Sequence, residues 1–223
     1  MTAMWRTDWV RKKQKVAVQL AKGQCDGSYG DAALILCSCL SALAAEVWPG
    51  DHIDRKRFVE LLAKFSLPQL LCTRMSIPLL VDALRSQQRV KEASQIEGKF
   101  MGQFPAGQIL TGDDIDHNEN EIRTACGSIS GKDMREFSYA NLLYKEIRSA
   151  YTHEGRTGDA AESWPQTGTP AYVSYVNSLV PPCRRIHFHI EWISALVEDA
   201  AEAVDRLTPI PPRQRPETWW LEG

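Results

Sequence analysis

Arg148 and His153 are the two residues whose types and spacing most directly suggest chemistry. An arginine can hold a phosphate through two parallel N–H groups, and a histidine can exchange a proton near neutral pH. On an ideal α-helix, a five-residue offset separates two side chains by about 140°, so the pair does not automatically face one target. From the spacing alone, an arginine and a histidine that cap an exposed helix end are the simpler interpretation.

The segment that carries both residues has helical periodicity. Apolar residues recur at three- and four-residue spacing from Ser138 onward, and Gly155 and Gly158 follow, as is typical of a helix end. The predicted buried stripe consists of Ala140, Leu143, Tyr144, Ile147, Ala150 and Tyr151. His153 then lies near the helix C-terminus, where the helix dipole favours its protonated form.

Further helices are predicted on both sides of this segment. A basic amphipathic helix within residues 1–22 ends at Gly23, and a charged face of this kind is more often solvated than bound to RNA. Ser28 begins a second helix that is apolar nearly all round up to Trp48, which is typical of the centre of a bundle. The last helix is expected to have an acidic outer face formed by Glu191, Glu198, Asp199, Glu202 and Asp205.

Irregular and extended segments separate these helices. Residues 87–120 are polar and contain several glycines, so we expect a long surface excursion with at most short helices. Two β-rich runs, residues 171–176 and 185–189, predict a small hairpin before the last helix. The predicted fold class is therefore all-α, a helical bundle with a small β-hairpin, in a single domain over residues 1–223.

The C-terminal tail, residues 208–223, differs from the rest of the chain. It is rich in proline and ends in two consecutive tryptophans, Trp219 and Trp220. Proline interrupts helices and strands, and exposed aromatic residues often mark an interaction site. We therefore expect the tail either to be disordered or to dock on a partner.

Composition and charge restrict the class of protein. The chain has 223 residues, of which 43% are hydrophobic and 24% charged, as in soluble globular proteins with a substantial core. Its net charge is 26 − 28 = −2, so nucleic-acid binding would need a local basic patch. Six scattered cysteines and no apolar leader favour the reducing cytoplasm. The apolar stretch of residues 31–48 has charged ends and internal serines, which favours a buried helix over a membrane span.

Most other motifs are better explained without a function. The run from Gly127 to Asp133 resembles a phosphate-binding loop, but it is one residue short and has aspartate where serine or threonine must meet magnesium. The acidic run of residues 113–117 lacks the glycine and the terminal glutamate of a calcium loop. His187 and His189 would share one strand face without an obvious third ligand, so we expect core or surface histidines, no metal site and no cofactor.

The order of these segments resembles the HEPN superfamily of ribonucleases. Its signature is an arginine followed by four to six residues and a histidine, late in a core helix of an all-α domain, and Arg148 and His153 match it. Residues 27–62 are similar to the opening helices of a plasmid- and defence-associated branch. Ser149 follows the arginine where the superfamily often has Asn, Asp or His, and Gly155 stands where some toxin members have a modifiable tyrosine.

The resemblance implies a metal-independent endoribonuclease that acts as a two-fold homodimer, with one composite cleft between the subunits. Arg148 would hold the scissile phosphate, and His153 would act as general base on the 2′-hydroxyl or as general acid on the leaving oxygen. RNA would be the substrate and a 2′,3′-cyclic phosphate the product. The supporting or RNA-binding residues on this segment would be Lys145, Ser149, Tyr151, Thr152 and Arg156.

The same resemblance implies a biological role and leaves alternatives open. It suggests a cytoplasmic toxin or phage-defence effector, with an antitoxin or activator protein as a further partner. The first alternative is a non-catalytic HEPN-type dimer that binds or scaffolds and uses Arg148 and His153 structurally. The second alternative is a helical bundle unrelated to HEPN proteins.

Overall fold

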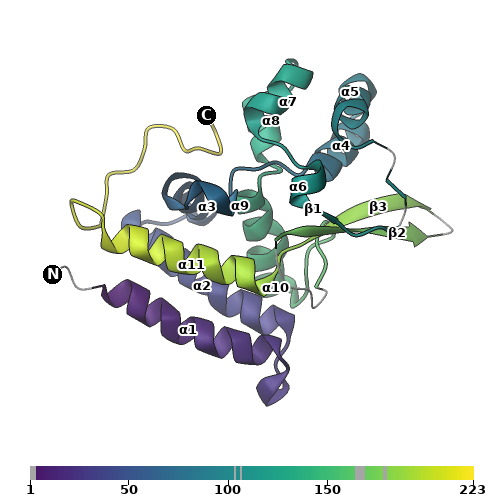
Figure 1. Ribbon diagram of the computed structural model, residues 1–223. Helices are drawn as coiled ribbons and strands as arrows, with labels where there is room; N and C mark the ends of the chain where they lie inside the picture. Colours follow the sequence, from purple (N-terminus) through teal and green to yellow (C-terminus); the bar gives the residue numbers. More distant parts are fainter. Residues whose placement is uncertain (1–3, 103, 106, 164–168, 178–179) are drawn as a thin grey trace.

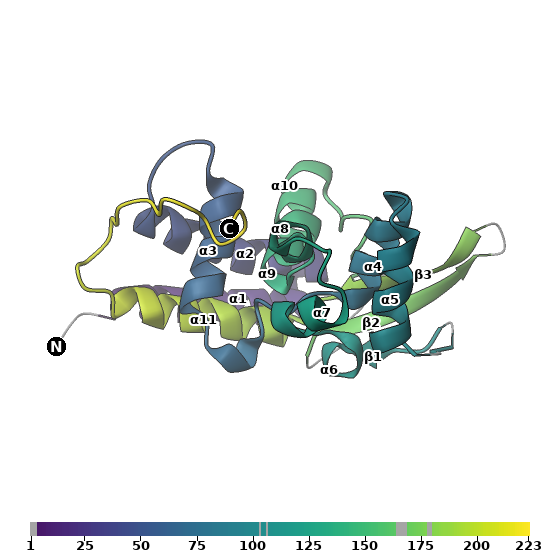
Figure 2. The ribbon, with the colours of Figure 1, turned by 90° about the horizontal axis from the view of Figure 1, so that it is seen from above.

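The computed structural model describes residues 4–102, 104–105, 107–163, 169–177 and 180–223 (Figure 1). The chain is mostly helical, with one small three-stranded antiparallel sheet. Figure 2 shows the sheet at the end of the molecule opposite the N-terminus, beside two of the shorter helices, α4 (Ile77–Ser86) and α5 (Val90–Phe100). The expected mostly helical body with a hairpin before the last helix is confirmed.

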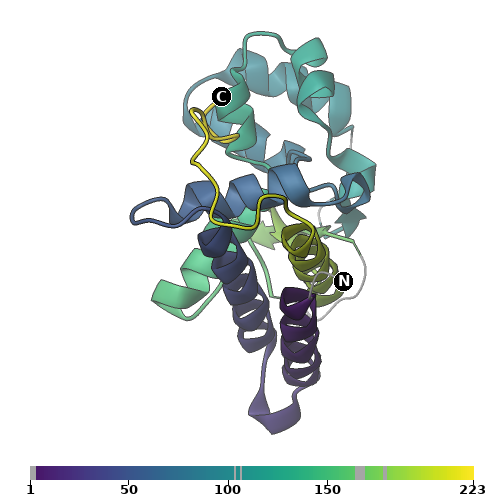
Figure 3. The ribbon, with the colours of Figure 1, turned by 90° about the vertical axis from the view of Figure 1, so that its left-hand side faces the viewer.

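Three long helices pack side by side at the other end: α1 (Trp5–Ala21), α2 (Tyr29–Val47) and α11 (Ile190–Asp205) (Figures 1 and 3). The predicted start of α2 is confirmed, because Ser28 accepts a hydrogen bond from the Asp31 backbone N–H and donates its own N–H to the Asp31 carboxylate. By length and composition alone, α2 is the described helix that could cross a membrane, and over half of its apolar stretch is buried inside the protein.

The outer face of α11 is less acidic than predicted, because two of its five carboxylates are buried. Asp205 accepts hydrogen bonds from the backbone N–H of Thr7 at 3.0 Å and from its hydroxyl at 2.8 Å. It also pairs with Arg6. Asp199 accepts a hydrogen bond from the backbone N–H of Leu67 at 2.6 Å. Both carboxylates accept hydrogen bonds from the backbone, and Asp205 thereby satisfies the buried N–H of Thr7.

The segment of residues 87–120 is more regular than predicted. It contains the eleven-residue helix α5, a two-residue strand β1 (Leu110–Thr111) and a short helix α6 (Gly112–Ile115). The apolar signal of α5 is sparse, since Ala93 and Ile96 are its fully buried residues. These two residues join a second hydrophobic cluster, which includes residues of α4 and of α7 (Glu119–Ala125).

The predicted hairpin consists of β2 (Ala171–Asn177) and β3 (Val180–His187), which lie antiparallel directly before α11. The third strand of the sheet, β1, is not predicted from the sequence. β1 pairs with β2, with Leu110 opposite Tyr172. A strand of two residues leaves no alternating pattern in the sequence, so its pairing depends on the tertiary fold.

The C-terminal tail is ordered and packs on the rest of the chain, which corrects the expectation of disorder. Its side chains Trp219 and Leu221 are buried, and the Trp219 ring packs edge-on against Trp48 at 5.8 Å between ring centroids. The Trp220 ring lies beneath the guanidinium of Arg135, 5.2 Å away. The tail therefore closes over α3 (Asp54–Phe65) and the bundle end.

The helix that carries Arg148 and His153 is continuous over residues 139–154 and is called the site helix below. It consists of α9 (Tyr139–Leu142), a π-helical segment (Leu143–Ser149) and α10 (Ala150–Glu154). Gly155 ends it with φ +69°, a left-handed conformation that glycine adopts without strain. The predicted helix and its end are thereby confirmed.

Candidate functional site

The apolar side of the site helix is fixed by α2 and α3. Gly30 of α2 touches the Tyr151 ring so closely that a Cβ at Gly30 would lie 2.3 Å from a ring carbon. The Tyr144 ring packs edge-on against Phe58 of α3, with 5.3 Å between centroids. These contacts fix the rotation of the helix and leave an outward arc of Lys145, Arg148, Ser149, Thr152 and His153, which we call the exposed arc.

Arg148 lies at the edge of the exposed arc that borders α2. Its guanidinium sits over the Tyr144 ring, 5.3 Å from the centroid. Burial raises the pKa of the Cys37 thiol on α2 to about 12, and the charge of Arg148 acts in the opposite direction, which places Arg148 beside α2. Within the described residues, no carboxylate lies within ion-pair distance of Arg148. Its N–H groups are therefore not engaged by an acidic side chain.

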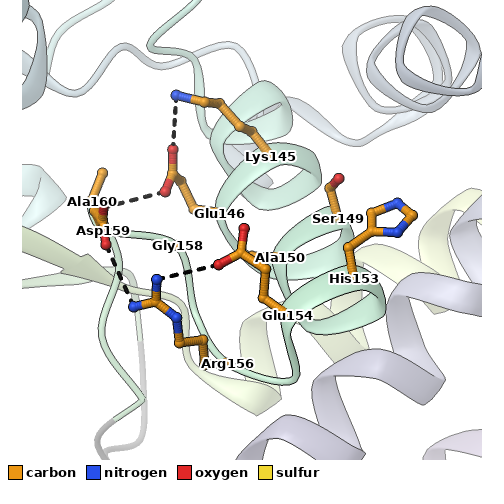
Figure 4. Close-up of a pocket in the computed structure, with 10 residues that line it drawn as sticks. All are labelled: Lys145, Glu146, Ser149, Ala150, His153, Glu154, Arg156, Gly158, Asp159 and Ala160. Atoms are coloured by element: carbon orange, nitrogen blue, oxygen red, sulfur yellow. Dashed lines mark hydrogen bonds and ion pairs between the residues drawn. The ribbon is translucent and has the colours of Figure 1, made fainter.

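His153 lies at the other edge of the exposed arc and lines a cleft of about 450 Å³. The cleft lies between the site helix and the loop that follows it, residues 155–160. Figure 4 shows the Ser149 and His153 side chains side by side, on the side of the helix away from Arg156. The residues that line the cleft are Lys145, Glu146, Ser149, Ala150, His153, Glu154, Arg156, Gly158, Asp159 and Ala160.

The structure thus brings together only part of the predicted site. Lys145, Ser149, Arg156 and His153 share the cleft, whereas Arg148 is not among its lining residues. Two further predicted residues point elsewhere: Tyr151 is half-buried against Tyr29 at 6.4 Å between centroids, and the Thr152 hydroxyl donates to the carbonyl oxygen of Arg148 at 2.6 Å.

The cations of the cleft are neutralised by neighbouring acids. Lys145 pairs with Glu146 at 3.1 Å. Arg156 pairs with Glu154 at 3.3 Å and with Asp159 at 3.6 Å (Figure 4). Exposed ion pairs such as those of Arg156 contribute only about 0–1 kcal/mol, so a phosphate could displace Glu154 and Asp159 at little cost. Arg148 differs from these cations, because a phosphate could bind it without displacing a described carboxylate.

Glu146 is a buried residue of the cleft that the sequence did not indicate, as it did not indicate Glu154 and Asp159. Its side chain is buried, and one carboxylate oxygen accepts a hydrogen bond from the backbone N–H of Ala160 at 3.3 Å. Its carbonyl oxygen accepts a second hydrogen bond from Gly158 at 2.8 Å. Glu146 therefore ties the loop of residues 155–160 to the helix. The available signal was its position between Leu143 and Ala150 at the three- and four-residue spacing of the buried stripe.

The π-helical segment modifies the geometry that the spacing predicts. Its backbone hydrogen bonds join residues five apart rather than four, so the angular offsets of an ideal α-helix do not apply across it. Such segments are rare and occur frequently at functional sites. In this protein the segment ends at Ser149, directly after Arg148, and Arg148 and His153 still lie at opposite edges of the arc.

His187 at the end of β3 and His189 directly before α11 are core residues. Both are buried, and His187 donates a hydrogen bond from Nδ1 to the carbonyl oxygen of Glu162, 2.9 Å away. Burial lowers the pKa of His187, which favours its neutral form. Among the described residues, no group of three or more His, Cys, Asp or Glu side chains is arranged to hold a metal ion.

The phosphate-loop-like run is a turn into a short helix, α8 (Gly131–Arg135). The Ser130 hydroxyl accepts a hydrogen bond from the backbone N–H of Asp133 at 3.1 Å and thereby caps that helix.

Comparison of the chain with protein-family models, with curated proteins and with solved structures gives no match. The resemblance to HEPN ribonucleases therefore depends only on Arg148, His153 and the opening segment of residues 27–62.

Proposed function

We propose that the protein is a metal-independent endoribonuclease of the HEPN type, which cleaves RNA through its 2′-hydroxyl. The observation that carries this proposal is the free guanidinium of Arg148, on the same exposed arc as the solvent-accessible imidazole of His153. The resemblance adds a role as a cytoplasmic toxin or phage-defence effector, held in check or triggered by an antitoxin or activator protein.

Each residue has a defined part in the proposed reaction. One His153 takes the proton of the 2′-hydroxyl as its oxygen attacks the adjacent phosphorus. The bond from phosphorus to the 5′-oxygen breaks, and a second histidine returns a proton to that oxygen. The products are a 2′,3′-cyclic phosphate and a 5′-hydroxyl. Arg148 stabilises the charge that develops on the phosphoryl oxygens, for which its planar fork is suited.

A second copy of the chain completes this site. Arg148 and His153 lie at opposite edges of the arc, so one copy does not direct both at one phosphate. A two-fold axis over the middle of the arc, near Lys145 and Ser149, would bring the Arg148 of one copy toward the His153 of the other. We expect light scattering to give the mass of a dimer, and a fully active monomer would contradict this arrangement.

The scaffold alternative has an observation in its favour. The cations that share the cleft with His153 are paired with Glu146, Glu154 and Asp159, so a single copy offers no strongly positive pocket. A non-catalytic HEPN-type dimer would use the same exposed arc only as a contact surface. The two functions differ in whether Arg148 and His153 are needed for cleavage or only for assembly.

Alanine variants separate the two functions. We expect Arg148→Ala and His153→Ala each to lower the rate of RNA cleavage by roughly 10²- to 10⁴-fold. Lys91→Ala is the matched control, since Lys91 is exposed on α5 and has no ion-pair partner among the described residues. Melting temperatures of the variants should stay near that of the wild type. Equal cleavage by wild type and His153→Ala, or none by either, would favour the scaffold.

A further inference from the structure

One face of α1 combines aromatic, aliphatic and basic side chains, all of them exposed except Trp9, which is partly buried against the core. Trp5, Trp9, Lys12, Lys13 and Val16 follow one another at spacings that place them on one side of a helix, and we call this set the α1 face. Trp5 is 54% exposed and Val16 is 45% exposed, although the other side of α1 is packed into the core. The guanidinium of Arg6 covers part of the Trp5 ring at 4.7 Å and leaves the rest to solvent.

The lysines of α1 are free of acidic partners. Within the described residues, no carboxylate lies within ion-pair distance of Lys12, Lys13 or Lys15. Arg11, on the side of α1 toward α11, differs from them, because it pairs with Glu198 at 2.8 Å. The positive charge of the α1 face is therefore not cancelled by the acidic residues of α11.

The α1 face adjoins the surface that carries Arg148. α2 lies between α1 and the site helix (Figure 3). Cys39 lies on the flank of α2 toward Lys13, where burial raises the pKa of its thiol to about 11 and the charge of Lys13 opposes that shift. Cys37 lies on the flank toward Arg148, and the exposed Ser38 lies between the two cysteines. One open face of α2 is thus bordered by Lys13 and by Arg148.

We propose that the α1 face binds the RNA strand that extends beyond Arg148, with Lys12 and Lys13 on its phosphates and Trp5 stacked on a base. The inference rests on the proposed function, which supplies RNA as the ligand. Sequence-independent binding of single strands typically combines a basic track with aromatic platforms. An anionic membrane is a poorer match, because the continuous apolar side of α1, with Val10 and Ala17, is packed in the core. The apolar side chains of the α1 face are few and are interleaved with lysines.

Equilibrium binding of a fluorescently labelled single-stranded RNA of about 15 nucleotides tests the proposal. The protein carries His153→Ala so that cleavage cannot consume the probe. We expect Lys12→Glu with Lys13→Glu to weaken binding by at least about tenfold at low salt. Lys12→Gln with Lys13→Gln should reduce the slope of log K against log salt by about 1.4, the value for two phosphate contacts on a single strand. Trp5→Ala should weaken binding by about 5- to 150-fold.

The control is Lys91→Glu with Lys99→Glu, two exposed lysines on α5 that change the net charge equally. This control should keep the affinity within about two- to threefold of the starting value. An unchanged affinity in Lys12→Glu with Lys13→Glu overturns the proposal, as does an equal loss in the α5 control. Binding to phosphatidylserine vesicles that this variant abolishes, with RNA affinity unchanged, would assign the face to membranes instead.

The binding assay does not depend on catalysis, so the two proposals fail separately. RNA that binds through the α1 face of a protein without ribonuclease activity would remove the proposed function and retain this inference. Conversely, cleavage that requires His153, together with normal binding by Lys12→Glu with Lys13→Glu, would remove the inference alone.

Discussion

The guanidinium of Arg148 lies over the ring of Tyr144, 5.3 Å from its centroid, at the edge of the site helix that borders α2. Tyr144 in turn packs edge-on against Phe58 of α3. The position of the one arginine on the exposed arc is therefore set by aromatic contacts, and no described carboxylate lies within ion-pair distance of its N–H groups.

This contact makes Tyr144 a positioning residue for Arg148. We expect Tyr144→Leu to lower the RNA cleavage rate by about 2- to 30-fold, the range of a cation–π contact. Tyr144→Phe keeps the aromatic face and should restore the rate to within about twofold of wild type. If Tyr144 only stabilises the fold through its contact with Phe58, Tyr144→Leu should lower the melting temperature. The two variants should then cleave RNA at the same rate at a temperature where both are folded.

The second prediction concerns Gly158 in the loop beside the cleft. A Cβ at this position would lie 2.1 Å from a carboxylate oxygen of Glu146, so Gly158→Ala should destabilise the protein by about 1–3 kcal/mol. Gly98→Ala is the control, because Gly98 lies in helix α5 with open space around it and alanine there should stabilise by roughly 0.5–1 kcal/mol. Urea unfolding measures both, and a stabilised Gly158→Ala would show that Glu146 does not hold the loop.

The third prediction compares two tryptophans. Trp219 in the tail is 7% exposed, and Trp219→Ala should cost about 3–5 kcal/mol of unfolding free energy. Trp5 is 54% exposed, so Trp5→Ala should change stability by no more than about 0.5–1 kcal/mol. Equal effects of the two substitutions in chemical denaturation would mean that the tail does not pack on the body.

The fourth prediction is a pH dependence from Asp116. Its buried carboxylate accepts hydrogen bonds from the hydroxyls of Tyr139 and Tyr172 and from the backbone N–H of Ile77. Burial raises its pKa to about 7, against the opposing effect of these hydrogen bonds. The folded protein thus keeps a proton that the unfolded chain releases near pH 4. The stabilisation is fully present below that pH and is lost as the pH rises toward about 7.

Asp116→Asn isolates this contribution from other carboxyl groups with shifted pKa values. We expect wild-type stability to fall by roughly a few kcal/mol more than that of Asp116→Asn between about pH 4 and pH 7. Urea unfolding across that range gives the comparison. Parallel pH profiles of the two proteins would show that Asp116 ionises in the folded state as it does in the unfolded chain.

Features with a local cause could be predicted from the sequence. Ser28 and Asp31 form a capping box within four residues, and the site helix repeats its apolar residues every three or four positions up to Gly155. The relative position of Arg148 and His153 was only partly predictable, because the π-helical turns of residues 143–149 change the α-helical offset. In the structure Arg148 lies over Tyr144, and His153 lines the cleft.

Features that depend on distant parts of the chain could not be predicted. Asp205 was assigned to an acidic outer face, but its partners Arg6 and Thr7 lie at the other end of the sequence. Glu146 looks like one more polar helix residue until the loop with Ala160 folds back onto it. The composition of the tail predicts disorder or docking on a partner, because nothing near Trp219 in the sequence indicates that it packs against Trp48.

The most direct test of the central claim is cleavage of one RNA strand in EDTA, beside the same strand with a single 2′-deoxynucleotide at the mapped cleavage site. If His153 moves the proton of the 2′-hydroxyl, the all-RNA strand is cut to a 2′,3′-cyclic phosphate and the deoxy-substituted strand stays intact at that position. Equal cleavage of both strands, or cleavage that stops in EDTA and returns with magnesium, would contradict a metal-independent ribonuclease built on Arg148 and His153.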